Sequence, residues 1–313
     1  MNKRAFLFTG QGSQYPGMGK DLYNKYNLFK NIFDETNEHL KIDLLDICSN
    51  EQELSKTHNA QIAIFAMSYG IYKLLKSHDI TPDCVAGFSL GEITSLAVSE
   101  ILSFNNTLDL IKIRGETMQE ACEYTPGSMY SIIGADDNLV ENICAEINGY
   151  VIPANYNCPG QIVISGETNA VEEAVKIFTD KKIRTIKLNV AGAFHSKLMQ
   201  YKQNKLTEFL KTLNFNQPKI DLYSNVTGTK FNFENDIKNF MLDYIPKQMS
   251  NPVRFRTELE NMSNSNDGCD LFIEIGAGKA LSGFVRRTCE NAKFTNIQNV
   301  DTFESAVKLF GEK

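Results

Sequence analysis

The sequence predicts an α/β protein in which a doubly wound, mainly parallel sheet carries a second, inserted sheet. Segments with apolar residues at helical spacing alternate with short apolar runs, which is the order that a parallel sheet requires. Between residues 127 and 189 this order changes to strand, helix, two strands, helix and strand. A glycine-flanked serine follows one of the apolar runs, where a strand of such a sheet would end.

The first predicted elements belong to the parallel sheet. Residues 4–9 form a short apolar strand, and residues 60–77 carry apolar side chains at the spacing of one helix face. A second strand ends near Val85. The chain therefore enters the sheet twice before residue 90.

The segment from residue 127 to 189 is predicted to form a separate small sheet. Its predicted strands are 128–134, 151–156, 161–165 and 183–188, and its predicted helices are 137–147 and 170–180. This βαββαβ order is that of a ferredoxin-like unit. We therefore expect a larger domain made of residues 1–126 and 190–313, with residues 127–189 inserted as a subdomain.

After the insert the chain returns to the larger domain. We predict a helix over 197–213, a strand over 220–224 and a last strand over 271–275, followed by Gly276-Ala277-Gly278 and another helix. Residues 261–267, Asn-Met-Ser-Asn-Ser-Asn-Asp, have the composition of a long loop.

Residues 87–92, Gly-Phe-Ser-Leu-Gly-Glu, have the pattern of a nucleophile elbow centred on Ser89. The glycines allow the sharp strand-to-helix turn that exposes the serine hydroxyl at the start of a helix. The backbone N–H of Leu90 would then point at a tetrahedral oxyanion, and the positive end of the helix dipole would add to its stabilisation. The motif therefore favours acyl transfer by Ser89. The alternative is a glycine-rich turn in which the serine has no catalytic role.

A serine nucleophile needs a base, and the chain has four histidines. His39, His58 and His78 have polar neighbours typical of solvent-facing positions. His195 instead follows a predicted strand and the small-residue turn Ala191-Gly192-Ala193, where a loop can present a catalytic group from a rigid scaffold. His195 is therefore the predicted base, although a capping or packed histidine would fit the same local sequence.

The order of these residues argues against an ordinary α/β-hydrolase triad. Such a triad runs serine, acid, histidine, with the histidine near the chain end, whereas no histidine follows His195 here. Asp136, Asp137 and Asp180 lie at predicted helix edges, where carboxylates cap or face solvent. A dyad whose histidine is oriented by a backbone carbonyl is the more plausible arrangement.

The loop Gly10-Gln11-Gly12-Ser13-Gln14 after the first strand matches neither phosphate-binding motif. A dinucleotide fingerprint requires glycine where Tyr15 stands, and a Walker loop ending at Gly19-Lys20 requires Ser or Thr where Asp21 stands. A second oxyanion donor is the better use of this loop, since such holes usually take donors from two loops.

Composition excludes several other classes. The net charge of −6 argues against a general nucleic-acid binder, and no apolar run is long enough for a membrane span or a signal peptide. The seven scattered cysteines contain no Cys-x-x-Cys pair, so neither a disulfide framework nor a zinc site is indicated, and a reducing cytoplasm fits best. Basic clusters that could meet phosphates or an acidic partner are Lys181, Lys182, Arg184 and Lys187; Arg254 and Arg256; and Arg286 and Arg287.

Six motifs in one order give the chain a family resemblance. They are the loop at 10–14, the elbow at 87–92, and the segments 114–119 (Arg-Gly-Glu-Thr-Met-Gln), 155–161 (Asn-Tyr-Asn-Cys-Pro-Gly-Gln), 192–196 (Gly-Ala-Phe-His-Ser) and 248–255 (Gln-Met-Ser-Asn-Pro-Val-Arg-Phe). The chain resembles the malonyl-CoA:acyl carrier protein transacylases over nearly its whole length. The resemblance implies a hydrolase-like α/β domain with a ferredoxin-like insert, in agreement with the pattern above.

The resemblance also implies a role for each matching residue. Ser89 resembles the acylated nucleophile and His195 its base and acid, while the N–H groups of Gln11 and Leu90 resemble the oxyanion hole. Arg114 resembles the carboxylate clamp, and a guanidinium does present parallel donors that suit the free carboxylate of malonate.

Three further positions are matched with less specific roles. Gln248 is placed where a backbone carbonyl orients the histidine, and Asn157 resembles a polar residue lining the site. Phe194 matches the variant associated with malonyl selectivity, because a bulky ring leaves little room for an α-methyl group. Phe88 departs from the family, which usually has histidine before the nucleophile, and a phenyl ring cannot make that histidine's hydrogen bonds.

The implied reaction is ping-pong transfer of malonyl from malonyl-CoA, through Ser89, to the phosphopantetheine thiol of acyl carrier protein in fatty-acid or polyketide synthesis. It needs no metal or redox cofactor. An acyl-thioester hydrolase would share Ser89 and His195 but has no use for Arg114. A catalytically silent docking module for carrier domains would need neither Ser89 nor His195. The cluster at 181–187 is the expected carrier contact, by charge complementarity.

Overall fold

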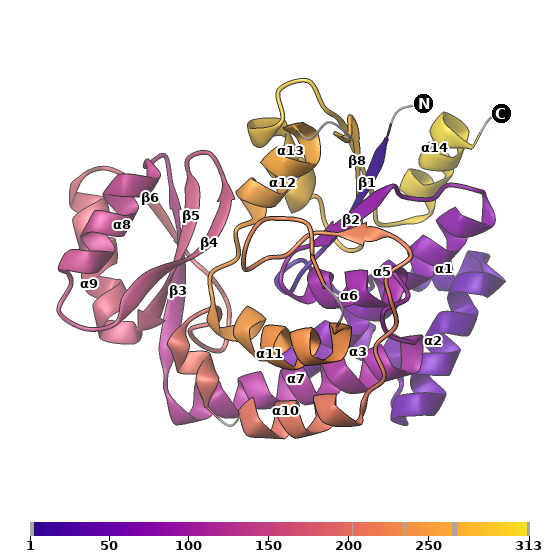
Figure 1. The fold of residues 1–313 in the computed structure, drawn as a ribbon, viewed down its shortest axis with the longest axis horizontal. Coiled ribbons are helices and arrows are strands. Elements are labelled where there is room, and N and C mark those ends of the chain that lie inside the picture. Colours follow the sequence, from indigo (N-terminus) through magenta and orange to yellow (C-terminus); the bar gives the residue numbers. More distant parts are fainter. Residues whose placement is uncertain (1–2, 202, 234–235, 265–267, 312–313) are drawn as a thin grey trace.

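The computed structural model describes residues 3–201, 203–233, 236–264 and 268–311, and places them around two sheets (Figure 1). The larger sheet has five strands in the order β7-β2-β1-β8-β9, and every neighbouring pair is parallel. The strands are β1 (Arg4–Phe8), β2 (Cys84–Gly87), β7 (Asp221–Leu222), β8 (Leu271–Ile275) and β9 (Lys293–Ile297). The predicted doubly wound parallel sheet is thus confirmed.

Both faces of this sheet are covered by helices, because alternate side chains of each strand point to opposite faces. Phe6 and Phe8 pack into the core on one face, whereas Ala5 and Leu7 pack into the core on the other. The first core is contributed by α1 (Lys20–Lys25), α2 (Asn27–Leu40), α3 (Leu44–Ser49), α4 (Glu51–Ser55), α5 (Thr57–Ser77), α6 (Leu90–Val98), α7 (Phe104–Tyr124), α10 (Gln203–Thr212), α11 (Ile237–Ser250) and α14 (Val300–Phe310). The second is contributed by α12 (Phe255–Asn264) and α13 (Ala280–Thr288).

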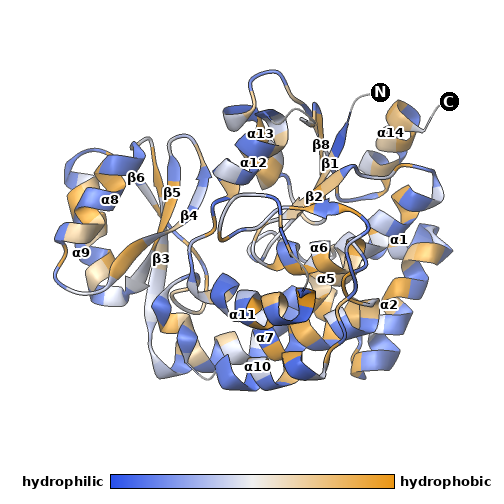
Figure 2. Cartoon of the chain, in the orientation of Figure 1, coloured by the Kyte–Doolittle hydropathy of each residue, from blue (hydrophilic) through white to orange (hydrophobic). Residues whose placement is uncertain are grey.

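Hydropathy follows this layering. In Figure 2 the outer helices α2 and α10 alternate between polar and apolar residues, as helices with one solvent-facing side do. By contrast, every residue of α6 is buried, including its single acid, Glu92. None of the helices in the described ranges is both long and apolar enough to cross a membrane.

The smaller sheet, at the left of Figure 1, is antiparallel and has the order β4-β5-β3-β6. Its elements are β3 (Gly127–Ile133), α8 (Asp137–Glu146), β4 (Val151–Cys158), β5 (Gln161–Glu167), α9 (Thr168–Asp180) and β6 (Arg184–Lys187). This is the βαββαβ unit predicted from sequence, with its own apolar core. We propose to treat residues 127–189 as a subdomain inserted between residues 1–126 and 190–313.

The two sheets are joined through the segment that follows α11. The Val253 N–H donates to the Ala154 carbonyl (2.8 Å), and the Tyr156 N–H donates to the Val253 carbonyl (2.8 Å). Helices α12 and α13 also pack against β4. Gln248 lies in the last turn of α11, just before this segment, so the junction between the sheets is close in sequence to a predicted site residue.

Four sequence predictions of elements need correction. Leu271–Ile275 is not the last strand, since β9 follows it; β9 is an edge strand with a single buried residue, so its sequence lacks a strand-like apolar pattern. The helix predicted over 197–213 is divided into a 3₁₀ turn, η1 (Lys197–Gln200), and α10, with Tyr201 in an extended conformation between them. The strand predicted over 220–224 shortens to β7.

The predicted loop over 261–267 is the fourth correction. Residues 261–264 form the last turn of α12, because Met262 is buried against the core. Residues 265–267 lie outside the described part of the chain.

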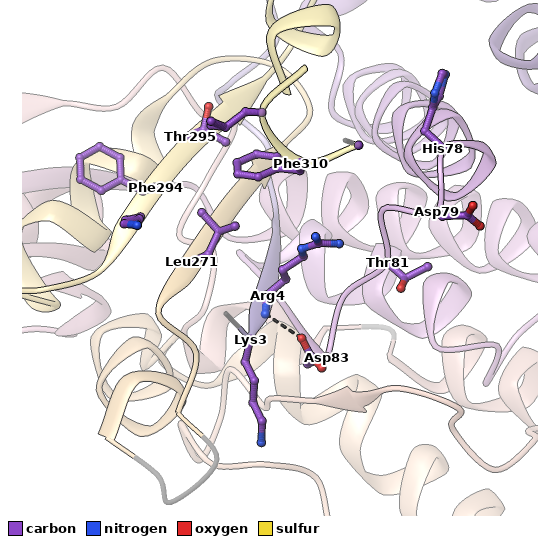
Figure 3. Close-up of a pocket in the computed structure, with 13 residues that line it drawn as sticks. Lys3, Arg4, His78, Asp79, Thr81, Asp83, Leu271, Phe294, Thr295 and Phe310 are labelled. Carbon is purple, nitrogen blue, oxygen red and sulfur yellow. Dashed lines mark hydrogen bonds between the residues drawn. The ribbon is translucent and has the colours of Figure 1, made fainter. Parts of the chain in front are cut away.

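A surface hollow of about 1000 Å³ lies at the amino ends of β1, β8 and β9 (Figure 3). Its lining includes Arg4, whose backbone N–H donates to Asp83, together with Lys3, His78 and Phe294. None of the predicted site residues lines it. Ser89 follows the carboxyl end of β2, the edge of a parallel sheet where ligands usually bind.

Candidate active site

Ser89 lies in a sharp turn between β2 and α6, as the elbow motif predicts. Its φ of 54° and ψ of −101° are strained for a residue with a side chain, and such conformations cost about 1–3 kcal/mol. The turn is tight enough that a Cβ on Gly87 would lie 1.9 Å from the Gly91 carbonyl carbon, and one on Gly91 would lie 2.0 Å from the Phe8 carbonyl oxygen. Only glycine fits at these two positions.

His195 lies within hydrogen-bonding distance of Ser89, as predicted. Its Nε2 is 2.7 Å from Ser89 Oγ, and its Nδ1 is 3.0 Å from the Gln248 carbonyl oxygen. Because a carbonyl oxygen can only accept, Nδ1 carries the ring proton, and the lone pair of Nε2 faces the serine hydroxyl. The backbone of His195, also at positive φ, is held by its N–H, which donates to the Met249 carbonyl at 3.1 Å.

The imidazole of His195 is uncharged at neutral pH. Burial and, to a smaller extent, the nearby cation of Arg114 lower its pKa to about 4, outweighing the hydrogen bond to Gln248, which raises it. An uncharged imidazole beside a hydroxyl is the form that can take its proton. The Ser89–His195 pair therefore has the protonation state of a nucleophile and its base.

Arg114 comes from the middle of α7 and is only 1% exposed. Its guanidinium donates to Gln61 Oε1 (2.9 Å), Gln248 Oε1 (3.1 Å) and Ser89 Oγ (3.2 Å). Burial lowers its pKa to about 10, although Glu92 opposes this, so the side chain stays charged at neutral pH.

Arg114 also retains capacity for an anionic ligand. Within the described ranges its Nε has no hydrogen-bond partner, and no carboxylate lies within ion-pairing distance of the guanidinium. A buried cation that is held only by neutral partners is well suited to bind a carboxylate next to Ser89.

The loop after β1 lies directly against the elbow. A Cβ on Gly10 would lie 2.3 Å from the Phe88 carbonyl oxygen, so only glycine allows this approach. The side chain of Gln11 accepts from Gln61 Nε2 at 3.2 Å. Among the described atoms, the backbone N–H groups of Gln11 and Leu90 donate to no acceptor, which leaves both free for an oxyanion.

Three other predicted positions have different surroundings. Asn157, on β4, is buried with its Oδ1 unpaired among the described residues, and it makes no hydrogen bond to Ser89 or His195. The ring of Phe194 is part of the main apolar core. Phe88 is half-buried, and its ring packs on Phe255 and Phe284 with centroids 5.3 and 6.1 Å away.

The predicted basic cluster at 181–187 is exposed in the turn after α9 and on β6, and none of its members hydrogen-bonds to a predicted site residue. Arg256 instead forms an ion pair with Asp137. Arg287 donates to Gln161 Oε1 at 3.1 Å.

Sequence reasoning missed two residues that the structure brings to the site. Gln61 bridges Arg114 and Gln11, and the signal for it is a polar residue within the apolar face of a predicted helix. Asn225 accepts a hydrogen bond from the Ser89 N–H, and the only signal for it is its place just after a predicted strand.

Comparison with known proteins gives concordant results. The family model described as acyl transferase domain matches residues 5–309. The malonyl CoA-acyl carrier protein transacylase of Bacillus subtilis is 36% identical over 100% of this chain and 99% of that protein.

Solved structures give the same result. The transacylase of that name from Clostridium perfringens has a TM-score of 0.91 and 35% identity, covering 98% of this chain and 96% of its own. A malonyl-transacylase solved in complex with its type II PKS acyl-carrier protein has a TM-score of 0.91 and 30% identity, and the match covers 98% of this chain and 99% of that one. The chain belongs to the acyl transferase family, and its relatives there are malonyl CoA-acyl carrier protein transacylases.

Proposed function

We propose that this protein transfers the malonyl group of malonyl-CoA to the phosphopantetheine thiol of acyl carrier protein through a malonyl-Ser89 intermediate. The names of the relatives supply the reaction class. The observation that carries the choice of substrate is the buried guanidinium of Arg114, 3.2 Å from Ser89 Oγ and without a carboxylate partner among the described residues. A hydrolase of neutral acyl thioesters would have no use for this cation.

In the first half-reaction His195 Nε2 takes the proton of Ser89 Oγ as the oxygen attacks the malonyl thioester carbonyl. The N–H groups of Gln11 and Leu90 stabilise the oxyanion of the tetrahedral intermediate. The intermediate collapses with cleavage of the C–S bond, and the protonated His195 returns its proton to the departing CoA thiolate. Throughout this step Arg114 pairs with the free malonyl carboxylate, exchanging its hydrogen bonds to Ser89 Oγ and Gln248 Oε1 for a bidentate pair.

The second half-reaction reverses this chemistry with a different thiol. His195 takes the proton of the phosphopantetheine thiol, whose sulfur attacks the malonyl-Ser89 ester. Collapse of the new tetrahedral intermediate breaks the C–Oγ bond, and Ser89 regains its proton from His195. The Gln248 carbonyl, 3.0 Å from Nδ1, stabilises the imidazolium that forms transiently in both halves.

The remaining predicted roles complete this proposal. Phe194 and Asn157 line the acyl site, with the Phe194 ring opposing an α-methyl group. The acidic carrier protein contacts the exposed cluster Lys181, Lys182, Arg184 and Lys187. The cytoplasm is the proposed location, since the thiol substrates and the seven cysteines suit a reducing compartment.

Initial-rate kinetics test the proposal. Malonyl-carrier formation is measured while malonyl-CoA and phosphopantetheinylated carrier protein are varied together, for the unmodified protein and for Ser89→Ala. Parallel double-reciprocal lines, with no transfer by Ser89→Ala, are expected of a covalent intermediate. Intersecting lines or transfer by Ser89→Ala would exclude the serine mechanism, and release of free malonate with the carrier ignored would indicate a hydrolase.

A further inference from the structure

Asn225, just after β7, uses its whole side-chain amide to hold the elbow. Its Oδ1 accepts from the Ser89 N–H (2.8 Å) and from Gln248 Nε2 (3.2 Å). Its Nδ2 donates to the Gly87 carbonyl (2.7 Å) and to Glu258 Oε1 (2.9 Å). The residue is 1% exposed, and its two acceptor and two donor positions are all occupied.

These partners fix the orientation of the amide. The Ser89 N–H can only donate and the Gly87 carbonyl can only accept, so a rotated amide would face a donor with a donor and an acceptor with an acceptor. The Asn225 side chain therefore hydrogen-bonds to the backbone on both sides of Phe88, at Gly87 and at Ser89. These bonds hold the turn in which Ser89 adopts its strained φ and ψ.

Asn225 is itself held by a buried polar network. Its backbone N–H donates to Glu92 Oε2, and its carbonyl accepts from the Arg254 N–H at 2.8 Å. Tyr244 Oη also donates to Glu92 Oε2, at 2.9 Å. Burial raises the pKa of Glu92 to about 8, so this acid is mainly uncharged at neutral pH, and burial also raises the pKa of Glu258.

The network connects the elbow to both side chains that hydrogen-bond to Ser89 Oγ, Arg114 and His195. Gln248 Nε2 donates to the Ser89 carbonyl (2.8 Å) as well as to Asn225 Oδ1, while Gln248 Oε1 accepts from Arg114. The Gln248 backbone carbonyl lies 3.0 Å from His195 Nδ1. Asn225 thus contacts the residue that orients the base and the backbone that presents the nucleophile.

We infer that Asn225 is a positioning residue: by clamping Gly87 and Ser89 it sets the direction of Ser89 Oγ toward His195 Nε2 and keeps the Leu90 N–H aimed at the oxyanion. This inference rests on the proposed role of Ser89 as nucleophile. Misplacing a reacting atom by about 1 Å can lower a rate about 100-fold, so loss of the clamp should reduce the reactivity of Ser89 far more than substrate binding.

The test compares Asn225→Ala with the unmodified protein. Pre-steady-state acylation by malonyl-CoA, followed by intact mass, should show a rate of malonyl-Ser89 formation lowered by about 100-fold, with the half-saturating malonyl-CoA concentration changed by less than about threefold. Inactivation by phenylmethanesulfonyl fluoride, which carries no carboxylate for Arg114, should slow by a similar factor.

Asn225→Asp gives a readout that a merely structural role would not move. The aspartate keeps the acceptor for the Ser89 N–H, but when ionised it opposes the Gly87 carbonyl and Glu258 with an acceptor; when protonated it can donate again. The other ionisable groups around it are Glu92, Tyr244, Arg114 and His195, and they titrate in both proteins. The ratio of variant to unmodified acylation rate should therefore fall as pH rises, whereas a structural defect gives a constant ratio.

Tyr244→Phe is the matched control. It removes the hydrogen bonds of Tyr244 Oη to Glu92, Ser224 and the Val226 N–H but touches neither Gly87 nor Ser89. Its acylation rate should stay within about threefold of the unmodified protein, even where its thermal stability falls as much as that of Asn225→Ala.

Three outcomes would overturn the inference: folded Asn225→Ala acylated within about threefold of the unmodified protein, Tyr244→Phe slowed as much as Asn225→Ala, or a pH-independent ratio for Asn225→Asp. If Asn225→Ala fails to fold, the pH series on Asn225→Asp decides alone. If the unmodified protein takes up no malonyl group, the proposed function fails, and the sulfonyl fluoride reaction still decides whether Asn225 positions Ser89.

Discussion

Removing the charge of Arg114 should change which acyl group the protein accepts. Arg114→Met keeps a long buried stem and loses the guanidinium that lies 3.2 Å from Ser89 Oγ. Malonyl-CoA then loses its carboxylate partner, whereas acetyl-CoA, which has no free carboxylate, loses nothing. The expected result is a large fall in malonyl transfer with little change in acetyl transfer.

The magnitude follows from the bonds exchanged. Each hydrogen bond to a charged group contributes about 1.5–3 kcal/mol, so a bidentate pair contributes about 3–6 kcal/mol. In the free protein the guanidinium already donates to Ser89 Oγ and Gln248 Oε1, and these bonds are given up when the carboxylate arrives. The lower half of the range therefore applies, which corresponds to a loss of about 10²–10³ in kcat/KM for malonyl-CoA.

The assay is acyl-Ser89 formation from malonyl-CoA and from acetyl-CoA, followed by intact mass at several substrate concentrations. Arg4→Gln is the matched control, because Arg4 lies at the amino end of β1 (Figure 3), whereas Ser89 follows the carboxyl end of the neighbouring parallel strand β2. It should leave the ratio of malonyl to acetyl acylation unchanged. A parallel loss of both acyl groups in Arg114→Met, or an unchanged ratio, would refute the role of Arg114 as the carboxylate partner.

Three further predictions concern pH and packing. Because burial lowers the pKa of His195 from 6.5 to about 4, the acylation rate should stay flat down to about pH 5 and fall only below it; a midpoint near 6.5 in stopped-flow data would contradict this. Gly91→Ala should lower the free energy of unfolding by about 1–3 kcal/mol or more and abolish acylation, because the new Cβ would lie 2.0 Å from the Phe8 carbonyl oxygen. Gly283→Ala, in a helix where the new Cβ meets open space, should raise the free energy of unfolding by about 0.5–1 kcal/mol in chemical denaturation and leave acylation unchanged. In the folded protein the pKa of Glu92 is raised from 4.5 to about 8, so between these pH values the native state binds more protons than the unfolded state, and the stability of the native state falls as pH rises. Glu92→Gln should lack this fall. If the melting temperatures of the variant and the unmodified protein do not move apart as pH rises toward about 8, the prediction is contradicted.

The sequence was most informative where the chemistry depends on local backbone. The elbow needs glycine at positions 87 and 91, and that requirement is visible in the letters before any contact is known. The βαββαβ order was likewise legible, because each of its elements has a regular apolar pattern. The edge strand β9 was not, since four of its five residues are not fully buried.

The site was least predictable where burial decides the role. Arg114 lies on a helix whose sequence does not reveal its buried face, and only the family resemblance singled it out. Gln61 and Asn225 acquire their roles from contacts with residues more than 50 and 130 positions away, Arg114 and Ser89 respectively. No local pattern records such contacts, because they arise from the packing of α5 on α7 and of β7 beside β2.

The central claim is that a malonyl group rests on Ser89 before it reaches the carrier protein. The most direct measurement mixes the protein with malonyl-CoA, maps the adduct by peptide mass, and then adds phosphopantetheinylated carrier protein. We expect one malonyl group on the peptide containing Ser89, none in Ser89→Ala, and its complete movement to the carrier thiol. An adduct on another residue, or one that decays to free malonate while the carrier remains unmodified, would contradict the account.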